Sequence, residues 1–204
     1  MIPLVKICGL TDDAAVAAAI DSGADAVGFV FANSVRRISV QRAAEISAGV
    51  PDTIRRVAVM MHPTNGEWQE VIRVFRPDVL QTDLADFEYL ELPDDVERWP
   101  VLREGAMPAD DVLPDMFVYE GKLSGSGETV DWKIAADMAK QKKLILAGGL
   151  NVANVTEAIN AVVPFGVDVS SGVESAPGKK DAAKIRAFIV AVRNAAASSE
   201  VVRS

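Results

Sequence analysis

Short apolar runs alternate with helix-like segments along most of this chain, and this alternation limits the possible fold more than any other feature. The runs are rich in branched residues and end at glycine, proline or polar residues, as buried strands do. They cover residues 4–8, 26–31, 56–61, 79–81, 101–103, 116–119, 144–147 and 167–170. Alternating strands and helices form parallel sheets, and a count of eight strands favours a closed barrel. We therefore predict an α/β protein, a compact single-domain (β/α)8 TIM barrel with few insertions.

Helices are predicted after most of these strands. They cover residues 11–20, 39–48, 67–75, 132–141, 151–162 and 181–197, with a weaker helix within 83–92. Thr11 and Ser39 are the expected N-caps, because their hydroxyl groups can accept from the free amides of a first turn. Four prolines interrupt residues 93–114, where only the strand at 101–103 is predicted. The alternative fold, an open doubly wound sheet, would need a glycine-rich phosphate loop after the first strand, and residues 8–11 are not one.

Composition limits the partners of the protein. The 204 residues contain no linker-like stretch, so we expect one domain over 1–204 with a frayed tail at about 198–204. The apolar runs are far shorter than the roughly 18 residues that span a bilayer, and no signal-like leader precedes the first strand. We therefore expect a cytoplasmic protein that does not contact membranes. The net charge of −8 argues against nucleic-acid binding. The sequence leaves the oligomeric state open.

The chain has one cysteine, Cys8, and one histidine, His62. One cysteine cannot form an internal disulfide, and these two residues cannot build a zinc or iron site of the usual kind. We therefore expect no metal. His62 precedes Pro63 and has no serine or cysteine near it in sequence, so we expect no catalytic role for it.

Lys6 and Cys8 share one face of the first strand, because side chains alternate along a strand. A lone cysteine is most often a small buried hydrophobe. In a barrel, however, functional residues gather at the C-terminal ends of the strands. That rule predicts a shared mouth for Cys8, Arg36, the loop 121–131, Gly148 and Ser170.

Two late loops resemble each other. Gly148 and Gly149 follow the seventh strand, and Ser170, Ser171 and Gly172 follow the eighth. In barrels these two loops, with a short extra helix, commonly bind phosphate through backbone amides. The alternative is that the glycines only end the strands.

Asp131 and Arg36 are each ambiguous as single residues. Asp131 precedes a predicted helix and is best explained on its own as an N-cap. Arg36 and Arg37 lie in a polar loop, where at least one of them is expected to be a solvated surface charge.

Several motifs point to one family when they are taken together. They are KICGLT at 6–11, GADA at 23–26, GFVF at 28–31, SVR at 34–36, DW at 131–132, LAGGL at 146–150, VDVSSGVE at 167–174 and PGKKD at 177–181. From residue 4 to about 188 the chain resembles the phosphoribosylanthranilate isomerases of tryptophan biosynthesis. The resemblance implies a barrel enzyme without a cofactor. Its reaction would be the Amadori rearrangement of N-(5-phosphoribosyl)anthranilate to 1-(2-carboxyphenylamino)-1-deoxyribulose 5-phosphate.

By position, the resemblance assigns the general base to Cys8 and the general acid to Asp131. A carboxylic acid can protonate the ribose ring oxygen, and a thiolate can remove a proton from sugar carbon two. Only about 3 % of an unperturbed thiol is ionised at pH 7, and Lys6 can raise that fraction. Arg36 suits the anthranilate carboxylate as a fork-shaped partner. The expected substrate-binding residues are Lys6, Arg36, Gly127, Gly148, Gly149, Ser170, Ser171 and Gly172.

The middle of the chain departs from the family pattern. Residues 124–127 read SGSG rather than GGTG, residues 81–84 read QTDL rather than QLHG, and the sixth strand ends at Glu120 where an aspartate is common. These changes leave the acid and the base in place and fall on the sugar and anthranilate contacts. Two alternatives therefore stay open. One is a phosphate-binding barrel lyase or synthase that acts on another sugar or heteroaromatic phosphate, and the other is a barrel that only binds a ligand or a partner.

Overall fold

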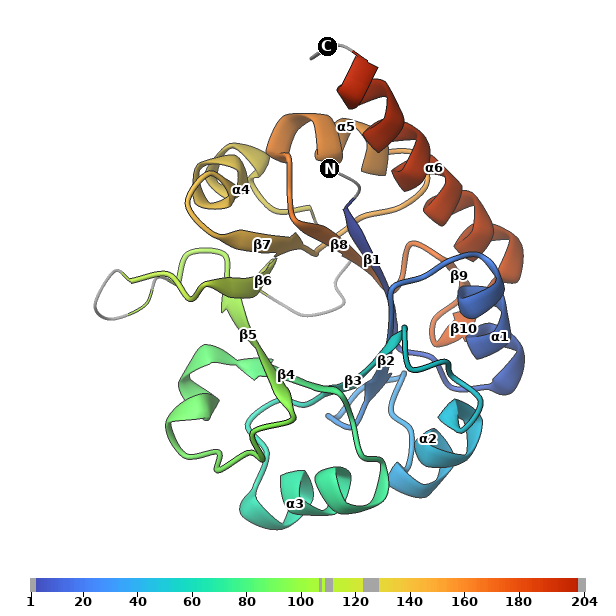
Figure 1. Ribbon diagram of the computed structural model, residues 1–204, viewed down its shortest axis with the longest axis vertical. Coiled ribbons are helices and arrows are strands. Elements are labelled where there is room, and N and C mark those ends of the chain that lie inside the picture. Colours follow the sequence, from blue (N-terminus) through green and yellow to red (C-terminus); the bar gives the residue numbers. More distant parts are fainter. Residues whose placement is uncertain (1–2, 107, 109–111, 123–128, 202–204) are drawn as a thin grey trace.

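The computed structural model describes residues 3–106, 108, 112–122 and 129–201. Eight parallel strands close into a barrel in chain order, and helices cover its outside (Figure 1). The strands are β1 (Leu4–Cys8), β2 (Ala26–Val30), β3 (Arg55–Val59), β4 (Val79–Asp83), β5 (Glu97–Arg103), β6 (Met116–Glu120), β7 (Lys143–Leu146) and β8 (Gly166–Val169). The predicted (β/α)8 barrel is thereby confirmed.

The helices leave part of the barrel wall thinly covered. They are α1 (Asp13–Asp21), α2 (Val40–Ser47), α3 (Asn65–Val74), α4 (Trp132–Ala139), α5 (Val155–Val162) and α6 (Ala182–Val201). The predicted helix within 83–92 is only a 3-10 turn, η1 (Leu84–Glu88). Between β5 and β6 none of the described residues is helical. After β8 the chain forms an antiparallel hairpin, β9 (Glu174–Ala176) and β10 (Lys179–Lys180), rather than a short helix.

Local capping differs from the prediction at α1. Asp12, not Thr11, is the N-cap, and its Oδ1 accepts from the amide of Ala15 at 2.8 Å. Thr11 lies one residue too early for this contact, and a carboxylate also interacts more favourably than a hydroxyl group with the helix dipole. Ser39 caps α2 as predicted.

The fifth strand is longer than predicted and runs through Pro100. Proline has no amide hydrogen to donate, and in a strand it normally interrupts pairing. Here β4 pairs with β5 over Glu97–Val101, whereas β6 pairs with β5 only from Val101 onward. Pro100 therefore lies where the ladder towards β6 has not yet begun. Its neighbour Trp99 is completely buried.

The alternation of side chains along the strands produces two apolar layers. One cluster combines residues of β2 to β7 with the residue that follows β7, namely Ala26, Val57, Val79, Trp99, Val101, Val118, Ile145 and Ala147. A larger cluster joins the opposite strand faces to the helices. Lys6 breaks the apolar pattern, because it is completely buried at the register where β1 meets Ala26 of β2 and Asp168 of β8. This buried charge lies directly below the mouth of the barrel.

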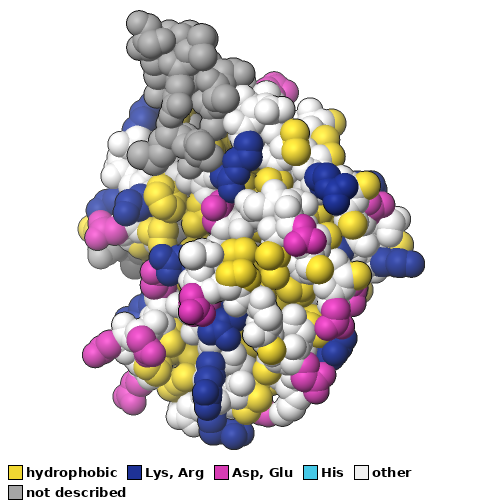
Figure 2. Space-filling view, turned by 45° about the vertical axis from the view of Figure 1, so that its right-hand side comes forward, with side chains coloured by type: hydrophobic (Ala, Val, Ile, Leu, Met, Phe, Trp, Pro, Cys, Tyr) yellow, Lys and Arg dark blue, Asp and Glu magenta, His cyan; other side chains and the backbone are white. Residues whose placement is uncertain are grey.

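The outer surface carries charges of both signs. Figure 2 shows Lys and Arg side chains lying among Asp and Glu side chains over one face, rather than a region of a single sign. In the described part of the chain, no helix combines the length and the hydropathy needed to cross a membrane.

Candidate active site

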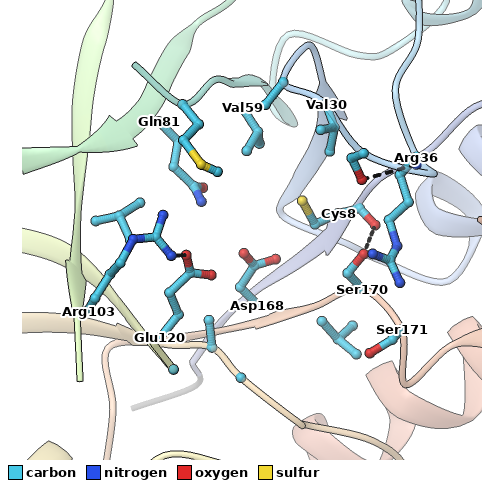
Figure 3. Close-up of a pocket in the computed structure, with 18 of the residues that line it drawn as sticks. Cys8, Val30, Arg36, Val59, Gln81, Arg103, Glu120, Asp168, Ser170 and Ser171 are labelled. Atoms are coloured by element: carbon cyan, nitrogen blue, oxygen red, sulfur yellow. Dashed lines mark hydrogen bonds and ion pairs between the residues drawn. The ribbon is translucent and has the colours of Figure 1, made fainter. Parts of the chain in front are cut away.

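A cavity of about 300 Å³ opens at the C-terminal ends of the barrel strands. Its lining includes six of the residues predicted from the sequence, namely Cys8, Arg36, Gly148, Gly149, Ser170 and Ser171. Lys6, Asp131 and Gly172 do not line it, and Gly127 lies outside the described residues. Figure 3 shows the thiol of Cys8 between Arg36 and Ser170 on one side and the polar groups of Gln81, Arg103 and Glu120 on the other.

Cys8 ends β1 and pairs with Gly28 of β2. A Cβ on Gly28 would lie 3.1 Å from the Cys8 sulfur and from Cε of Lys6, so glycine leaves the room that both side chains occupy. Burial raises the pKa of the Cys8 thiol, and the positive charges of Lys6 and Lys180 oppose that shift only in part. The expectation that Lys6 favours the thiolate is correct in sign, but burial is the larger effect.

Lys6 and Asp168 form a buried ion pair below Cys8. Nζ of Lys6 lies 2.7 Å from Oδ2 of Asp168, and the two side chains are 0% and 9% exposed. Burial lowers the pKa of Lys6, but Asp168 and Cys8 outweigh this effect, so the net pKa is raised and the ammonium form persists. Lys6 thus lies beneath the cavity wall rather than in its lining.

Asp168 is a cavity residue that the sequence analysis missed. Its Oδ1 is buried and has no hydrogen-bond partner among the described residues, although the side chain lines the cavity. A signal for it exists in the sequence, because an aspartate within the apolar run 166–169 of a strand requires a buried cation. Lys6 is the corresponding cation on β1, the neighbouring strand in a closed barrel.

The loops after β7 and β8 meet at the cavity. Gly148 and Gly149 both have positive φ, 86° and 60°. Gly172 forms a bridge with Asn151, and a Cβ at this position would lie 1.9 Å from the carbonyl oxygen of Leu150. Only glycine permits this approach, so Gly172 joins the two loops instead of lining the cavity. The hydroxyl of Ser170 donates to the carbonyl of Cys8 at 3.1 Å, which links these loops to β1.

Arg36 and Lys180 share one buried carboxylate, that of Glu174. Nε and Nη2 of Arg36 donate to its two oxygens at 2.7 and 3.0 Å, and Nζ of Lys180 donates at 2.7 Å. Burial alone would raise the pKa of Glu174, but these hydrogen bonds lower it to about 2. Arg36 is therefore a cavity residue that is paired with Glu174, not a solvated surface charge. The sequence analysis did not include Glu174 or Lys180 as site residues.

The opposite wall of the cavity includes Glu120, one of the positions at which the chain departs from the family pattern. Arg103 lies 2.7 Å from Asp83 through Nη2 and 2.7 Å from Glu120 through Nη1. Gln81 is 4% exposed, and its Oε1 has no hydrogen-bond partner among the described residues. This wall can therefore offer both an amide and a guanidinium group to a bound molecule.

Asp131 is the N-cap of α4. Its carboxylate accepts from the amides of Lys133 and Ile134 at 2.8 and 3.3 Å, and its own amide donates to Glu104 at 2.7 Å. It is exposed and lies outside the described cavity lining. Burial raises the pKa of Tyr119 in β6 to about 12, and the negative charges of Glu104 and Asp131 act in the same direction.

His62 forms a separate cluster with two carboxylates. Its Nδ1 lies 2.8 Å from Asp86 and its Nε2 lies 3.3 Å from Asp83, and the hydrogen bond to Asp86 is the main cause of its raised pKa. The ligand atoms of these three residues lie within 4.8 Å of one another, a spacing that a metal ion could also satisfy. His62 does not line the cavity.

Known proteins related to this chain cover most of its length. The sequence model described as N-(5'phosphoribosyl)anthranilate (PRA) isomerase matches residues 5–191. The N-(5'-phosphoribosyl)anthranilate isomerase of Streptococcus gordonii is 41% identical over 194 residues, which cover 93% of this chain and 97% of the relative.

Solved structures agree with the sequence comparison. Phosphoribosyl anthranilate isomerase from Thermotoga maritima matches with a TM-score of 0.81 and 31% identity, over 95% of this chain and 100% of that one. A phosphoribosyl anthranilate isomerase in complex with reduced 1-(o-carboxyphenylamino)-1-deoxyribulose 5-phosphate matches with a TM-score of 0.78, 31% identity and the same coverage. The chain therefore belongs to the N-(5'-phosphoribosyl)anthranilate isomerase family.

Proposed function

We propose that Cys8 and Asp131 carry out the proton transfers by which this chain isomerises N-(5'-phosphoribosyl)anthranilate. The reaction of the family is an Amadori rearrangement in tryptophan biosynthesis, and it converts the closed aminosugar into 1-(2-carboxyphenylamino)-1-deoxyribulose 5-phosphate. Both substrate and product carry a phosphate and an aromatic carboxylate. A suitable site must therefore bind an anion at each end of the sugar and must place an acid and a base between them.

The rearrangement requires two proton transfers. Asp131, in its protonated form, gives a proton to the ribose ring oxygen as the bond from that oxygen to C1 breaks, and the nitrogen lone pair forms a Schiff base. The Cys8 thiolate then takes the proton from C2, and the electron pair of that bond forms the C1–C2 double bond of an enaminol as the C1–N double bond becomes single. Tautomerisation of the enaminol, in which C1 gains a proton and the C2 hydroxyl loses one, yields the ketone. The role of Cys8 is supported by its position in the cavity lining, whereas the role of Asp131 rests on the family motif.

The loops after β7 and β8 are proposed to bind the phosphate. Gly148, Gly149, Ser170 and Ser171 line the cavity, and backbone amides in glycine-rich loops are suitable phosphate donors. Gly172 would contribute by holding the two loops together.

Arg36 is proposed to bind the anthranilate carboxylate. Nε and Nη2 of its guanidinium group form the hydrogen bonds to Glu174, so the edge of the group that faces this carboxylate is occupied. A planar guanidinium group that also lines the cavity suits a carboxylate ligand. Cys8, Arg36 and the loops after β7 and β8 line one cavity, and that juxtaposition is the single observation that carries the proposed function.

The test is the decay of anthranilate fluorescence with freshly prepared phosphoribosylanthranilate, for wild type and for Cys8→Ser. We expect turnover by the wild type and a loss of about 10²- to 10⁴-fold in kcat/KM in the variant, which is the usual contribution of a general base. Turnover by Cys8→Ser at the wild-type rate would contradict the role of Cys8. An inactive wild type whose Tm still rises with inorganic phosphate would instead favour the lyase or synthase alternative.

A further inference from the structure

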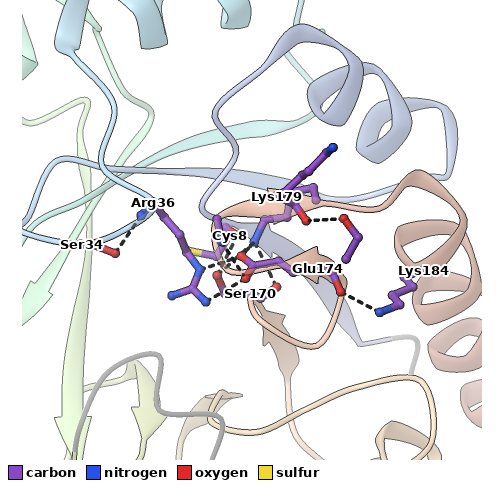
Figure 4. A network of polar contacts seen from close by, with 10 residues as sticks. Cys8, Ser34, Arg36, Ser170, Glu174, Lys179 and Lys184 are labelled. Carbon is purple, nitrogen blue, oxygen red and sulfur yellow. Dashed lines mark hydrogen bonds and ion pairs between the residues drawn. The ribbon is translucent and has the colours of Figure 1, made fainter.

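Glu174 lies outside the cavity lining and binds Arg36, which lines the cavity, and Lys180, which contacts Ser170. It is the first residue of β9, and its side chain is 4% exposed. Its carboxylate accepts from four donors: Nε and Nη2 of Arg36, Nζ of Lys180 at 2.7 Å, and the amide of Gly178 at 3.1 Å. Figure 4 shows Arg36, Cys8 and Ser170 on one side of Glu174 and Lys184 on the other side.

Arg36 depends on Glu174 for its orientation. Both Nε and Nη2 of its guanidinium group bind the carboxylate, which fixes the plane of the group. Its aliphatic stem lies close to Gly9, where a Cβ would come within 2.7 Å of Cδ. One edge of the guanidinium group is thereby fixed against Glu174, and Arg36 also lines the cavity.

Lys180 connects the same carboxylate to the phosphate loop. Its Nζ shares Oε1 of Glu174 with Arg36 and also donates to the carbonyl and hydroxyl of Ser170, at 3.0 and 3.2 Å. The Lys180 side chain is fully buried. Two cations that share one oxygen would repel each other strongly without the carboxylate, because the surroundings screen them poorly.

We propose that Glu174 is a positioning residue, which holds Arg36 in the orientation that binds the anthranilate carboxylate. The inference rests on the proposed function, since it assigns that carboxylate to Arg36. It predicts two unequal effects for Glu174→Gln. Anthranilate binding weakens because Arg36 loses its fixed plane. Phosphate binding does not weaken, because Lys180 keeps both contacts with Ser170 and one negative charge near the loop is removed.

Direct binding to the free protein tests the proposal without relying on turnover. Calorimetric titrations with anthranilate and with inorganic phosphate give a Kd for each end of the cavity. For Glu174→Gln we expect the Kd of anthranilate to rise about tenfold, as for a lost charge-assisted hydrogen bond, and the Kd of phosphate to rise less than about twofold. In turnover with phosphoribosylanthranilate, KM should rise more than kcat falls. The pH profile should keep its shape.

Two further variants separate positioning from general loss of structure. Lys184→Met removes a 2.7 Å hydrogen bond to the backbone carbonyl of Glu174 and leaves the carboxylate unchanged, so both Kd values should stay at wild type. In an Arg36→Met background, Glu174→Gln should add nothing to the loss of anthranilate affinity, because both substitutions remove the same interaction. If Glu174→Gln does not fold, Glu174→Asp keeps the charge but withdraws the carboxylate, and it is measured in the same way.

The outcomes are distinct. The positioning role is supported if Glu174→Gln weakens the binding of anthranilate but not that of phosphate. It is overturned if the substitution weakens both ligands equally or weakens neither. It is also overturned if Glu174→Gln lowers anthranilate affinity in the Arg36→Met background as much as it does in the wild type. A wild type that binds both probes but does not turn over phosphoribosylanthranilate would overturn the proposed function, while unequal loss in Glu174→Gln would still support the positioning role.

Discussion

Nζ of Lys6 lies 2.7 Å from Oδ2 of Asp168, across the junction of β1 and β8 that closes the barrel. Both side chains are almost completely removed from solvent, and Cys8 lies two residues beyond Lys6 on the same strand face. The pair therefore combines two roles. It satisfies two charges in the barrel interior, and it sets the electrostatic surroundings of the proposed base.

Lys6→Met should strongly destabilise the protein. The substitution leaves the Asp168 carboxylate buried without its cation, and breaking a buried pair in this way typically costs about 3–5 kcal/mol of unfolding free energy. The exposed pair Lys140–Asp137 has the same 2.7 Å separation, but its side chains are 73% and 65% exposed. Lys140→Met should cost less than about 1 kcal/mol. Urea unfolding of both variants checks the contrast, and equal losses would mean that the Lys6–Asp168 pair adds nothing beyond a surface pair.

The Cys8 thiol should ionise only at alkaline pH. Burial raises the pKa of Cys8, so its thiolate absorbance should develop beyond the usual thiol range near about 8.5. Since the folded-state pKa lies above the unfolded value, the associated stabilisation is complete below the unfolded pKa and is lost as pH rises through the folded one. Cys8→Ser should therefore lose less stability than wild type between neutral and alkaline pH. Thiolate absorbance that is already complete at pH 7 would contradict the raised pKa.

Substitutions of the two neighbours should move the Cys8 pKa in opposite directions. Lys6 lowers it and Asp168 raises it, so Lys6→Met should shift the thiol titration to higher pH and Asp168→Asn to lower pH. The thiolate absorbance of the folded variants, followed against pH, measures each shift with Cys8→Ser as the blank. Shifts of the same sign would show that changes in burial, not in charge, dominate both variants.

Gly172→Ala should disrupt the junction of the loops after β7 and β8. The added Cβ would lie 1.9 Å from the carbonyl oxygen of Leu150, so the backbone must move, at a cost on the order of 3 kcal/mol. Gly49→Ala is the matched control, because no heavy atom lies within 4 Å of its added Cβ. We expect a lower Tm and weaker binding of inorganic phosphate for Gly172→Ala, and neither change for Gly49→Ala. Wild-type phosphate affinity in Gly172→Ala would argue against a phosphate site at this junction.

The sequence was sufficient to predict the barrel because the signals for it are local. Each strand is a short apolar run, and eight of them with intervening helices leave few other arrangements. The rule that functional residues lie at the C-terminal strand ends then correctly brought Cys8, Arg36, Gly148 and Ser170 to one cavity. Pro100 misled the analysis of β5, because proline is only compatible with this strand where the ladder to β6 is absent. The point at which β6 begins to pair with β5 depends on the strand register, which the sequence pattern does not show.

The charge pairs of the site could not be predicted in the same way. Glu174 and Arg36 are 138 residues apart in sequence, and Lys6 and Asp168 are 162 apart. Each pair forms only because the barrel closes and the hairpin after β8 turns back towards the mouth. Residue types alone therefore indicated charged candidates, whereas their partners, burial and pKa shifts depend on the folded structure.

Asp131 can be tested so that its two possible roles are separated. As the N-cap of α4 it accepts from two backbone amides, and an asparagine side chain provides a comparable oxygen. Asp131→Asn should therefore keep the stability of the wild type within about 0.5 kcal/mol, whereas Asp131→Ala should lose about 1 kcal/mol. If Asp131 is also the general acid, both variants lose about 10²- to 10⁴-fold in kcat/KM, because neither asparagine nor alanine can donate the proton. The contrary result is an activity that follows stability, near wild type in Asp131→Asn and reduced in Asp131→Ala. It would leave Asp131 as a helix cap and would place the acid on a different residue.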